Sequence, residues 1–273
     1  MCVTHMTCPS GDVCNKQPDP LEGLMTSPER FALFLDIDGT LLDIAPTPGA
    51  VAVPDDLGRD LAALSRYLGG SLALVTGRSI ATVDAFFAPQ RFAVAGLHGA
   101  EMRFADGTRY GTASSEPFNE AKALLRLRRP EPEKVIFEDK GAAVALHYRL
   151  APAAQHAVEA LMEEARRVAG DDWYVQRGKM VIELRPAKAN KGDALKSFME
   201  TAEFSGRLPI AIGDDLTDED MFVAAKQEGG AAIRVGSEPG ITSADTVLHS
   251  PADLRSRLGS IACSRLCSQG TSR

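Results

Sequence analysis

Two carboxylates follow a short apolar segment near the start of the chain. Asp36 and Asp38 come directly after residues 31–35, and Gly39 permits a sharp turn behind them. Alternate side chains of an extended chain point to the same side, so both carboxylates face one spot at the end of the expected strand. Carboxylates this close repel one another, and a bound cation or a shared proton relieves the conflict. The pair therefore predicts metal-assisted or acid–base chemistry at a strand end.

A second acidic cluster follows another apolar segment, residues 209–212. It contains Asp214, Asp215 and Asp218. Two groups of strand-end carboxylates make an oxygen-only site of the kind that Mg²⁺ prefers. We expect Asp214 to be a direct ligand and Asp215 and Asp218 to supply supporting oxygens. Thr217 with Asp220 also resembles a helix cap, so a solvated acidic helix start is the alternative explanation of this cluster.

Thr76 and Lys191 lie at two further junctions between expected elements. Thr76 follows the apolar residues 72–75, and its hydroxyl with the backbone N–H groups of the next helix could bind phosphate. Lys191 begins another expected helix and could hold a transferring phosphoryl group. Each signal is weak alone, since a Thr-Gly pair often only caps a helix and a lone lysine is usually solvated.

The elements that carry these residues alternate between strand and helix, which predicts an α/β fold with a parallel sheet covered by helices on both faces. The expected strands are residues 31–35, 72–75, 92–95 and 209–212, and the expected helices are residues 55–68, from 191, after 217, and from a capping box at 250–253. Residues 101–110 read as a hairpin through Asp106-Gly107. The following block, with two helices and paired strands, reads as an α+β insertion.

The expected domain organisation follows from this pattern. Residues 29–107 and 187–259 form a discontinuous catalytic core, and residues 108–186 form the inserted domain. Residues 1–28 are expected to be a disordered extension, and removal of residues 1–24 should leave activity intact. Residues 260–273 are expected to be a frayed tail.

Composition limits the classes of partner. The chain has 273 residues and a formal net charge of −7, so we expect no nucleic-acid partner. No apolar run approaches the ~20 residues that cross a bilayer, and the N-terminus has no signal-peptide layout, so we expect no membrane association. A body free of cysteine predicts a cytoplasmic location without disulfides. The five cysteines lie near the termini: Cys2, Cys8, Cys14, Cys263 and Cys267.

Together, in this order, the four motifs resemble those of the aspartate-nucleophile phosphatases of the haloacid dehalogenase (HAD) superfamily. The resemblance implies a Rossmann-like core with a C2-type cap in the insertion. It implies that Asp36 is the nucleophile, that Asp38 is the general acid and base, and that Thr76 and Lys191 bind the phosphoryl group. It also implies a Mg²⁺ cofactor held by Asp36, by the backbone carbonyl of Asp38 and by Asp214.

Three further segments resemble the trehalose-6-phosphate phosphatase family within that superfamily. They are Gly-Leu-His-Gly-Ala-Glu at 96–101, Glu-Asp-Lys at 138–140 leading to His-Tyr-Arg at 147–149, and residues 178–186. The resemblance implies hydrolysis of trehalose 6-phosphate, the last step of trehalose biosynthesis, and pairing with a trehalose-phosphate synthase. The implied substrate-binding residues are Asp36, Ile37, Asp38, Arg78, His98, Glu138, Lys140 and Glu183.

Two alternatives stay open on the sequence. A phosphatase of another sugar phosphate, of the sucrose-phosphate or mannosyl-phosphoglycerate type, would share the core motifs. A non-catalytic module that binds a sugar phosphate beside a glycosyltransferase would not need both Asp36 and Asp38. Lys179, Glu183 and Arg185 share one face of an expected strand, which suits sugar hydroxyls but is also the pattern of any half-buried strand.

Overall fold

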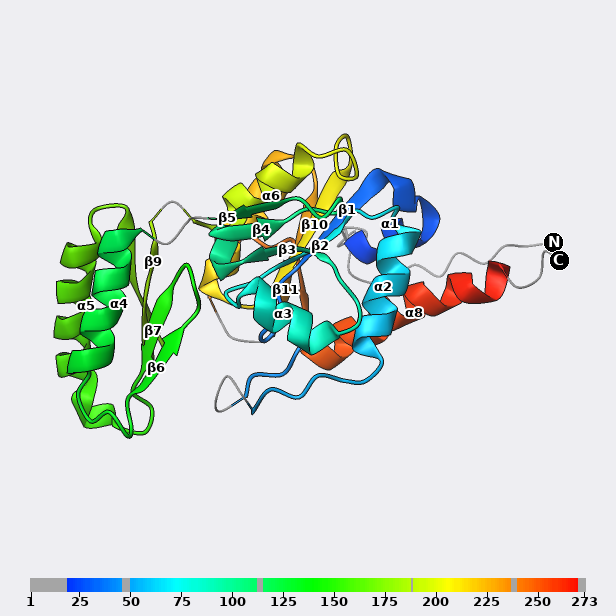
Figure 1. Ribbon diagram of the computed structural model, residues 1–273. Coiled ribbons are helices and arrows are strands. Elements are labelled where there is room, and N and C mark those ends of the chain that lie inside the picture. The colour runs from blue at the N-terminus through cyan, green and yellow to red at the C-terminus, as the bar shows by residue number, and fades with distance from the viewer. Residues whose placement is uncertain (1–18, 46–49, 112–114, 188, 237–239, 270–273) are drawn as a thin grey trace, which may run out of the picture.

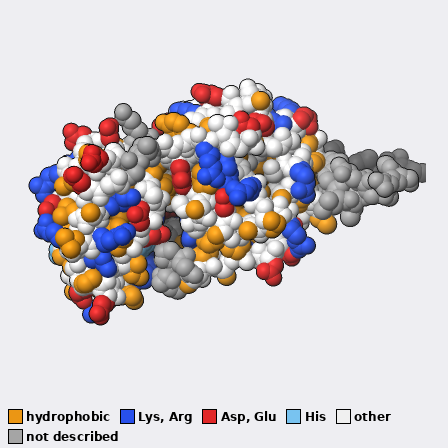
Figure 2. Space-filling model, in the orientation of Figure 1, with side chains coloured by type: hydrophobic (Ala, Val, Ile, Leu, Met, Phe, Trp, Pro, Cys, Tyr) orange, Lys and Arg blue, Asp and Glu red, His pale blue; other side chains and the backbone are white. Residues whose placement is uncertain are grey.

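The computed structural model describes residues 19–45, 50–111, 115–187, 189–236 and 240–269. It contains a larger core, on the right of Figure 1, and a smaller cap on the left. On the face shown in Figure 2, basic and acidic side chains are interspersed over both units. Among the described residues, none of the helices combines the length and apolar character needed to cross a membrane.

The core is built on an eight-stranded sheet in the order β12-β11-β10-β1-β2-β3-β4-β5. Neighbouring strands from β12 to β3 pair in parallel, whereas β4 and β5 form an antiparallel hairpin at one edge. The strands are β1 (Phe31–Leu35), β2 (Leu72–Val75), β3 (Ala93–Gly96), β4 (Glu101–Arg103), β5 (Arg109–Gly111), β10 (Leu208–Gly213), β11 (Ala231–Val235) and β12 (Thr246–Leu248). The predicted α/β class and parallel sheet are confirmed.

Helices cover both faces of this sheet because side chains alternate along each buried strand. In β1, Leu33 and Leu35 belong to one hydrophobic cluster, and Ala32 and Phe34 belong to another. The first face carries α1 (Pro20–Thr26), α2 (Leu57–Tyr67), α3 (Ile80–Phe87) and α8 (Pro251–Gln269), and the second carries α6 (Lys191–Met199) and α7 (Glu219–Gln227). Short 3₁₀ helices occur at Pro28–Arg30, Leu97–Gly99, Pro152–Ala154 and Leu216–Asp218.

The cap is a four-stranded antiparallel sheet with two helices on one face (Figure 1). Its elements are α4 (Glu116–Arg128), β6 (Ile136–Asp139), β7 (Val144–His147), α5 (Gln155–Ala169), β8 (Trp173–Gly178) and β9 (Val181–Pro186), with sheet order β6-β7-β9-β8. Ile182 and Leu184 are buried in the cap's hydrophobic core, while Glu183 and Arg185 alternate with them. The opposite face of the sheet is therefore polar and available to form a site.

Two expected domain boundaries are wrong. Strand β5 pairs with β4 in the core sheet, so the cap begins after this hairpin and not at residue 108. Helix α8 continues to Gln269, and Ile261 is 3% exposed, so the segment expected to fray from residue 260 is helical over most of its length.

Strand β6 of the cap was not predicted from the sequence, because its four residues lack a clear alternation of polar and apolar side chains.

Part of the expected N-terminal disordered extension is helical. Residues 20–26 form α1, in which Asp19 caps the helix by accepting from the N–H of Leu21. Leu21 and Leu24 are 3% and 0% exposed and belong to the core cluster. Residues 1–18 lie outside the described residues, and so do Cys2, Cys8 and Cys14.

A truncation series should therefore separate the two parts of this segment. A chain that starts at Asp19 keeps α1, whereas a chain that starts at Met25 loses both buried leucines. Burial of one leucine contributes roughly 1.5–3 kcal/mol, part of which offsets the cost of ordering the helix. We expect the second truncation to lower the free energy of unfolding by about 2 kcal/mol or more, measured by urea denaturation. Equal stability of the two chains would show that α1 contributes nothing to the core.

Candidate active site

Three buried strands deliver polar residues to one edge of the core sheet, where the cap faces it. Asp36 follows β1 and is 4% exposed, Thr76 follows β2, and Asp214 follows β10. Carboxylate oxygens of Asp36, Asp214 and Asp218 lie within 4.8 Å of one another. The predicted convergence of the two acidic segments is therefore present, because parallel neighbours end at the same edge of a sheet.

Lys191 lies inside this acidic cluster. Its Nζ donates to Asp36 Oδ1 at 2.7 Å and to Asp218 Oδ1 at 2.6 Å, and its side chain is 3% exposed. Asn190 starts the helix of Lys191 by accepting from the N–H of Asp193. The ammonium group is thus fixed beside the carboxylate expected to be the nucleophile.

Asp218 organises the turn after β10. Its Oδ2 accepts from the backbone N–H groups of Asp214 and Asp215, both at 3.0 Å, while Oδ1 accepts from Lys191. Asp215 is exposed and caps the 3₁₀ helix by accepting from the N–H of Leu216. Asp215 and Asp218 therefore form the helix cap at this turn. The expected helix cap formed by Thr217 and Asp220 is wrong.

Burial and mutual repulsion disfavour the charged forms of these carboxylates. Burial raises the pKa of Asp36 well above its ordinary value, Lys191 opposes this rise, and Asp218 and Asp214 add to it. Burial, and then the charge of Asp218, raise the pKa of Asp214 to about 7. An added cation would relieve both effects.

The donor set fits a hard divalent cation. It consists of carboxylate oxygens, and Asp214 is fixed by a hydrogen bond from Thr40 Oγ1 to its Oδ1 at 3.1 Å. Gly39 has a φ of +80°, and a Cβ placed there would lie 2.0 Å from Asp214 Oδ2. Only glycine leaves room for this carboxylate. Asp36 and Asp214 are the residues that would hold the cation, since the described contacts of Asp218 already occupy both its oxygens.

The carboxylate of Asp38 is outside this cluster. Arg78 donates from Nε to Asp38 Oδ2 and from Nη2 to Asp38 Oδ1, both at 2.6 Å, and the guanidinium lies over the ring of Phe86. The expected contact of Asp38 with a metal, through its backbone carbonyl alone, stays a prediction. Arg78 was expected at the rim between cap and core. Its guanidinium instead contacts the carboxylate of Asp38, the expected general acid.

Thr76 follows β2 but lines neither the cleft over Asp36 nor the adjoining cavity, and the expected phosphate pocket at the next helix is wrong. Thr76 is fully buried, and its Oγ1 accepts from the N–H of Arg78 at 3.2 Å. Helix α3 is capped by Ser79, and the N–H of Ile80 donates to Glu101 Oε1 at 2.6 Å. The start of this helix is therefore occupied by the chain's own side chains.

The side chain of Ile37 cannot contact a ligand. It is 0% exposed and packs in the core cluster on the α2 face of the sheet. Its carbonyl oxygen accepts from the N–H groups of Leu41 and Leu42. Any substrate contact of Ile37, which was expected to bind substrate, would have to come from its remaining backbone group.

His98 lies between the core site and the cap. It is 9% exposed, its φ of +59° is in the left-handed region, and its Nδ1 has no hydrogen-bond partner. Burial lowers the pKa of His98 well below its ordinary value, and the positive charges of Lys191, Arg185 and Lys140 lower it further. The imidazole is therefore neutral, with one donor and one acceptor nitrogen.

Glu138, Lys140 and Glu183, the cap residues expected to bind substrate, lie together on the open face of the cap sheet. Glu138 and Glu183 are both opposite Ala145 in the strand register. Lys140 Nζ donates to Glu183 Oε2 at 2.8 Å, and Glu138 pairs with His147 at 2.7 Å. The hydrogen bond from His147 lowers the pKa of Glu138.

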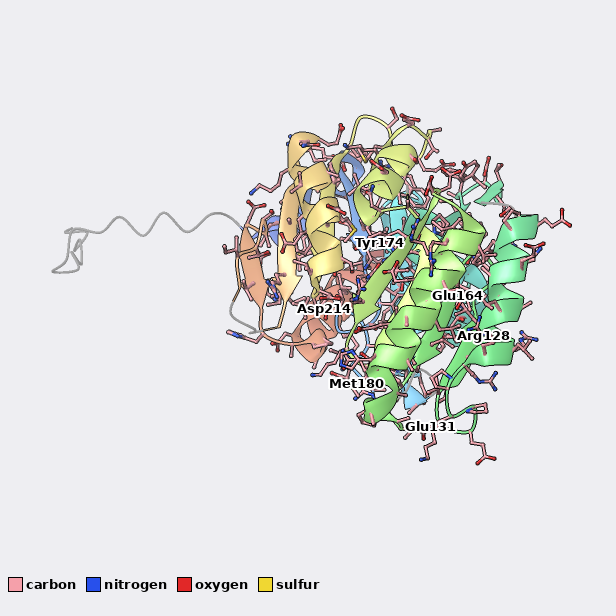
Figure 3. All side chains as sticks on the ribbon, turned by 90° about the vertical axis from the view of Figure 1, so that its left-hand side faces the viewer. Arg128, Glu131, Glu164, Tyr174, Met180 and Asp214 are labelled. Atoms are coloured by element: carbon pink, nitrogen blue, oxygen red, sulfur yellow. The ribbon has the colours of Figure 1, made fainter. Side chains whose placement is uncertain are left out.

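A cleft of about 730 Å³ opens over the acidic cluster, and a second cavity of about 630 Å³ adjoins it. Asp36, Asp38, His98, Lys191 and Asp214 line the cleft, whereas Glu138, Lys140 and Glu183 line neither space. Cap residues that sequence reasoning left out of the site do line them: Arg149, Tyr174, Gln176, Arg177, Lys179 and Arg185. The alternation of polar and apolar residues at 179–185 in the sequence could have indicated that Lys179 and Arg185 belong to the site. In Figure 3, which looks onto the cap, Tyr174 and Asp214 are labelled.

Comparison with known proteins identifies the family. The sequence model of the family Trehalose-phosphatase matches residues 34–251. The chain is 50% identical over 244 residues to a probable trehalose-phosphate phosphatase of Sinorhizobium fredii, covering 89% of this chain and 92% of that protein. The chain belongs to the trehalose-phosphatase family. It is accordingly a phosphatase, a hydrolase of phosphoric monoesters, and the resemblance seen in the motifs is confirmed.

Further relatives agree with this assignment. A trehalose-6-phosphate phosphatase of Escherichia coli is 39% identical over 246 residues, with coverage of 87% of this chain and 90% of that protein. A bifunctional trehalose-6-phosphate synthase/phosphatase of Thermoproteus tenax is 31% identical, and the match spans 81% of this chain and 30% of that protein.

Solved structures support the same fold. The structure of a trehalose-6-phosphate phosphatase related protein has a TM-score of 0.73 at 27% identity, covering 87% of this chain and 99% of that one. A phosphatase of the haloalkanoate (HAD) superfamily from Bacteroides thetaiotaomicron has a TM-score of 0.59 at 18% identity, covering 86% and 96%. The second likeness shows the fold alone, which is that of HAD phosphatases with a cap.

Proposed function

We propose that this protein hydrolyses trehalose 6-phosphate to trehalose and phosphate, with Mg²⁺ as cofactor and through an aspartyl-phosphate on Asp36. The observation that carries the proposal is the contact of Lys191 with Asp36, within reach of Asp214 and beside Asp38. The expected nucleophile Asp36, the ammonium group of Lys191 and the expected acid Asp38 thus line one cleft. This cleft faces the polar side of the cap. Binding alone would not require this set.

In the first step, a carboxylate oxygen of Asp36 attacks phosphorus while the bond from phosphorus to the sugar oxygen breaks. Asp38 gives its proton to the departing sugar oxygen. In the contact described above both carboxylate oxygens of Asp38 accept from Arg78, so this pair must open before Asp38 can act as the acid. The arriving phosphate offers the guanidinium of Arg78 another anionic partner.

In the second step, Asp38 removes a proton from water, which attacks phosphorus and breaks the bond to Asp36. Lys191 and the Thr76 hydroxyl bind the phosphoryl oxygens, and preorganised charges of this kind supply most of the acceleration. Asp36, Asp214 and the backbone carbonyl of Asp38 would hold Mg²⁺, which would supply positive charge to neutralise the phosphate. Asp215 and Asp218 keep the ligand-bearing turn in place.

The cap binds the sugar part of the substrate in this proposal. Glu138, Lys140 and Glu183 share the polar face of the cap sheet, and their carboxylates and ammonium group would hydrogen-bond sugar hydroxyls once the cap closes over the substrate. His98 lines the cleft and would lie beside the sugar phosphate. Arg78 joins the rim at the Glu138 side, since its charge contributes to lowering the pKa of Glu138. The cap thereby excludes bulk water from the aspartyl-phosphate.

The decisive experiment measures phosphate release. Purified protein is given trehalose 6-phosphate, sucrose 6-phosphate, mannosyl-phosphoglycerate and glucose 6-phosphate, each with Mg²⁺ and with a chelator. We expect trehalose 6-phosphate to be hydrolysed with the highest kcat/KM, and only with Mg²⁺. A preference for another sugar phosphate would favour the alternative phosphatases, and no release from any would favour a non-catalytic binding module.

Removal of the metal should also make stability pH-dependent. The pKa of Asp214 is about 7 in the folded protein against a reference value of 3.8, so the folded state binds more protons between these values. In chelator, the free energy of unfolding should therefore fall as the pH rises from about 4 to about 7. Saturating Mg²⁺ should reduce this slope, because it offsets the same charge. Urea denaturation across this range checks the sign, and identical slopes in both conditions would contradict the assigned cation site.

Glu183→Ala should affect the sugar selectively. It removes the partner of Lys140 on the cap without touching the acidic cluster, so we expect kcat/KM for trehalose 6-phosphate to fall about tenfold or more. The kcat/KM for p-nitrophenyl phosphate should change much less. Glu164→Ala is the matched control, because Glu164 also forms an ion pair on the cap, with Arg128. Equal losses on both substrates would contradict sugar recognition by Glu183.

The expected partner and location are part of the same proposal. The bifunctional relative carries synthase and phosphatase activities in its name, which supports supply of the substrate by a trehalose-phosphate synthase. A cytoplasmic location suits a chain whose exposed Cys263 is a free thiol.

A further inference from the structure

Arg185 is the last charged residue of the cap strand β9. The strand ends at Pro186, and the next element, the core helix α6, begins with Lys191. Arg185 is half-buried and takes no part in the chemical steps described above. Its place in the chain nevertheless puts it between the cap and the ammonium group that contacts Asp36.

The guanidinium of Arg185 binds the linker that joins the cap to α6. Its Nη1 donates to the carbonyl oxygen of Ala189 at 2.7 Å. The next residue, Asn190, caps α6 by accepting from the N–H of Asp193, and Lys191 follows it directly. Hydrogen bonds from an ionised donor are stronger than those between neutral groups. A side chain of the cap therefore holds the backbone just before Lys191.

The linker is also packed against the core. Ala189 is 9% exposed and belongs to a small hydrophobic cluster that spans both units. Its other buried members are Leu97 and Ala100 from the core and Ala143 from the cap. A Cβ placed on Gly99 would lie 3.1 Å from the carbonyl oxygen of Asn190, so the turn after β3 touches the linker. A movement of this linker would therefore be transmitted to the start of α6.

Carboxylates of both units surround Arg185. Burial lowers the pKa of Arg185, and the negative charges of Glu183 on the cap and Asp220 on the core oppose this change. Asp220 lies in the first turn of α7 and lines the same cavity as Arg185. The guanidinium thus stays charged at the junction of cap and core, where it holds the Ala189 carbonyl.

Lys191 depends on accurate placement of this junction. Its Nζ reaches Asp36 and Asp218 through hydrogen bonds of 2.7 and 2.6 Å. The N–H groups in the first turn of a helix have no partner within the helix, so the preceding linker helps to decide where α6 begins. In catalysis a misplacement of about 1 Å can cost about 10²-fold in rate. A small shift of the linker would therefore be visible in turnover.

We propose that Arg185 is a positioning residue for Lys191, acting through the linker whose carbonyl it holds. The inference rests on the proposed function, because it takes Lys191 as the group that binds the phosphoryl oxygens. It gives Arg185 no contact with the substrate. The effect of Arg185 should therefore appear in the phosphoryl transfer that all ester substrates share.

The test measures kcat on two esters. Arg185→Met keeps a long side chain but removes the donor, and kcat should fall about tenfold for both trehalose 6-phosphate and p-nitrophenyl phosphate, with less than about a threefold change in KM. Arg185→Lys keeps a charged donor for the Ala189 carbonyl and should restore kcat to within about threefold of the wild type. Arg166→Met is the matched control and should leave kcat unchanged. Arg166 is also a half-buried cap arginine, but it pairs with Glu163 and Asp171 on the cap.

A double substitution tests the route through Lys191. In a Lys191→Met background, Arg185→Met should lower kcat by less than about twofold, because the group on which Arg185 acts is already absent. Losses that multiply would show that Arg185 acts independently of Lys191 and would overturn the inference. Urea denaturation identifies any variant that fails to fold. If the double variant fails, the two esters and the rescue by Arg185→Lys decide the question.

The outcomes separate this inference from the function on which it depends. A loss confined to trehalose 6-phosphate would overturn the inference, because Arg185 would then act on the sugar. Unchanged kcat on both esters in Arg185→Met would also overturn it, and the proposed function would stand in both cases. A wild-type protein that hydrolyses p-nitrophenyl phosphate but not trehalose 6-phosphate would overturn the proposed substrate. The losses on p-nitrophenyl phosphate would then decide the role of Arg185.

Discussion

Asp36→Asn is expected to lower kcat for trehalose 6-phosphate by about 10⁴-fold or more. The substitution keeps the shape of the side chain but removes the carboxylate oxygen that attacks phosphorus in the proposed mechanism, and no neighbouring group would replace it. Lys191 would still have Asp218 as an anionic partner, so the fold should persist. Phosphate release under saturating substrate and Mg²⁺ measures the loss.

A second measurement tests the covalent step itself. Wild-type protein mixed with phosphate-labelled substrate and quenched in acid should retain label on the chain, and Asp36→Asn should retain none. Asp106→Asn is the control, because Asp106 is an exposed aspartate on the β4–β5 hairpin whose hydrogen bonds join it to Thr108. Near-normal turnover by Asp36→Asn would show that the nucleophile is another residue.

Lys191→Met is expected to damage both stability and turnover. Removing one partner of a buried ion pair leaves uncompensated charge, which typically costs about 3–5 kcal/mol. Here Asp36 and Asp218 would both lose their shared cation, and the loss of Lys191 would raise the pKa of Asp36 further. We expect the free energy of unfolding in chelator to fall by an amount in that range, and kcat to fall by about 10²-fold or more.

Mg²⁺ should distinguish this electrostatic explanation from a packing defect. A divalent cation at the same oxygens restores positive charge, so added Mg²⁺ should raise the melting temperature of Lys191→Met more than that of the wild type. Lys226→Met is a control, because Lys226 forms a half-exposed ion pair with Asp245 on the core surface. An equal Mg²⁺ response in wild type and Lys191→Met would argue that lost packing explains the instability.

The strand ends were predictable from the sequence because short apolar runs and the polar residues after them are local patterns. Asp36 and Asp214 were placed correctly beside each other, since parallel neighbours finish at one edge of a sheet. Lys191 was located at the start of its helix by the same reasoning. The family resemblance rests on these local patterns too, and the comparisons bear it out.

Helix α1 shows where local patterns fail. Its seven residues include a proline, a glycine and an acidic group and are too few to show a clear helical period, and only packing against the core buries Leu21 and Leu24. The extension of α8 past residue 260 was missed for the same reason. Short amphipathic helices gain their stability from tertiary contacts, which periodicity alone does not reveal.

The sequence by itself determined the order of the strands and helices and the identity of the groups at the strand ends, because both depend on neighbours within a few residues. Only the tertiary structure decided that Arg78 engages Asp38, that Asp218 joins Lys191 to the turn after β10, and that the Nδ1 atom of His98 is buried without a hydrogen-bond partner. These contacts join side chains from different elements. Their geometry depends on how the cap and the sheet pack, and no local spacing encodes it.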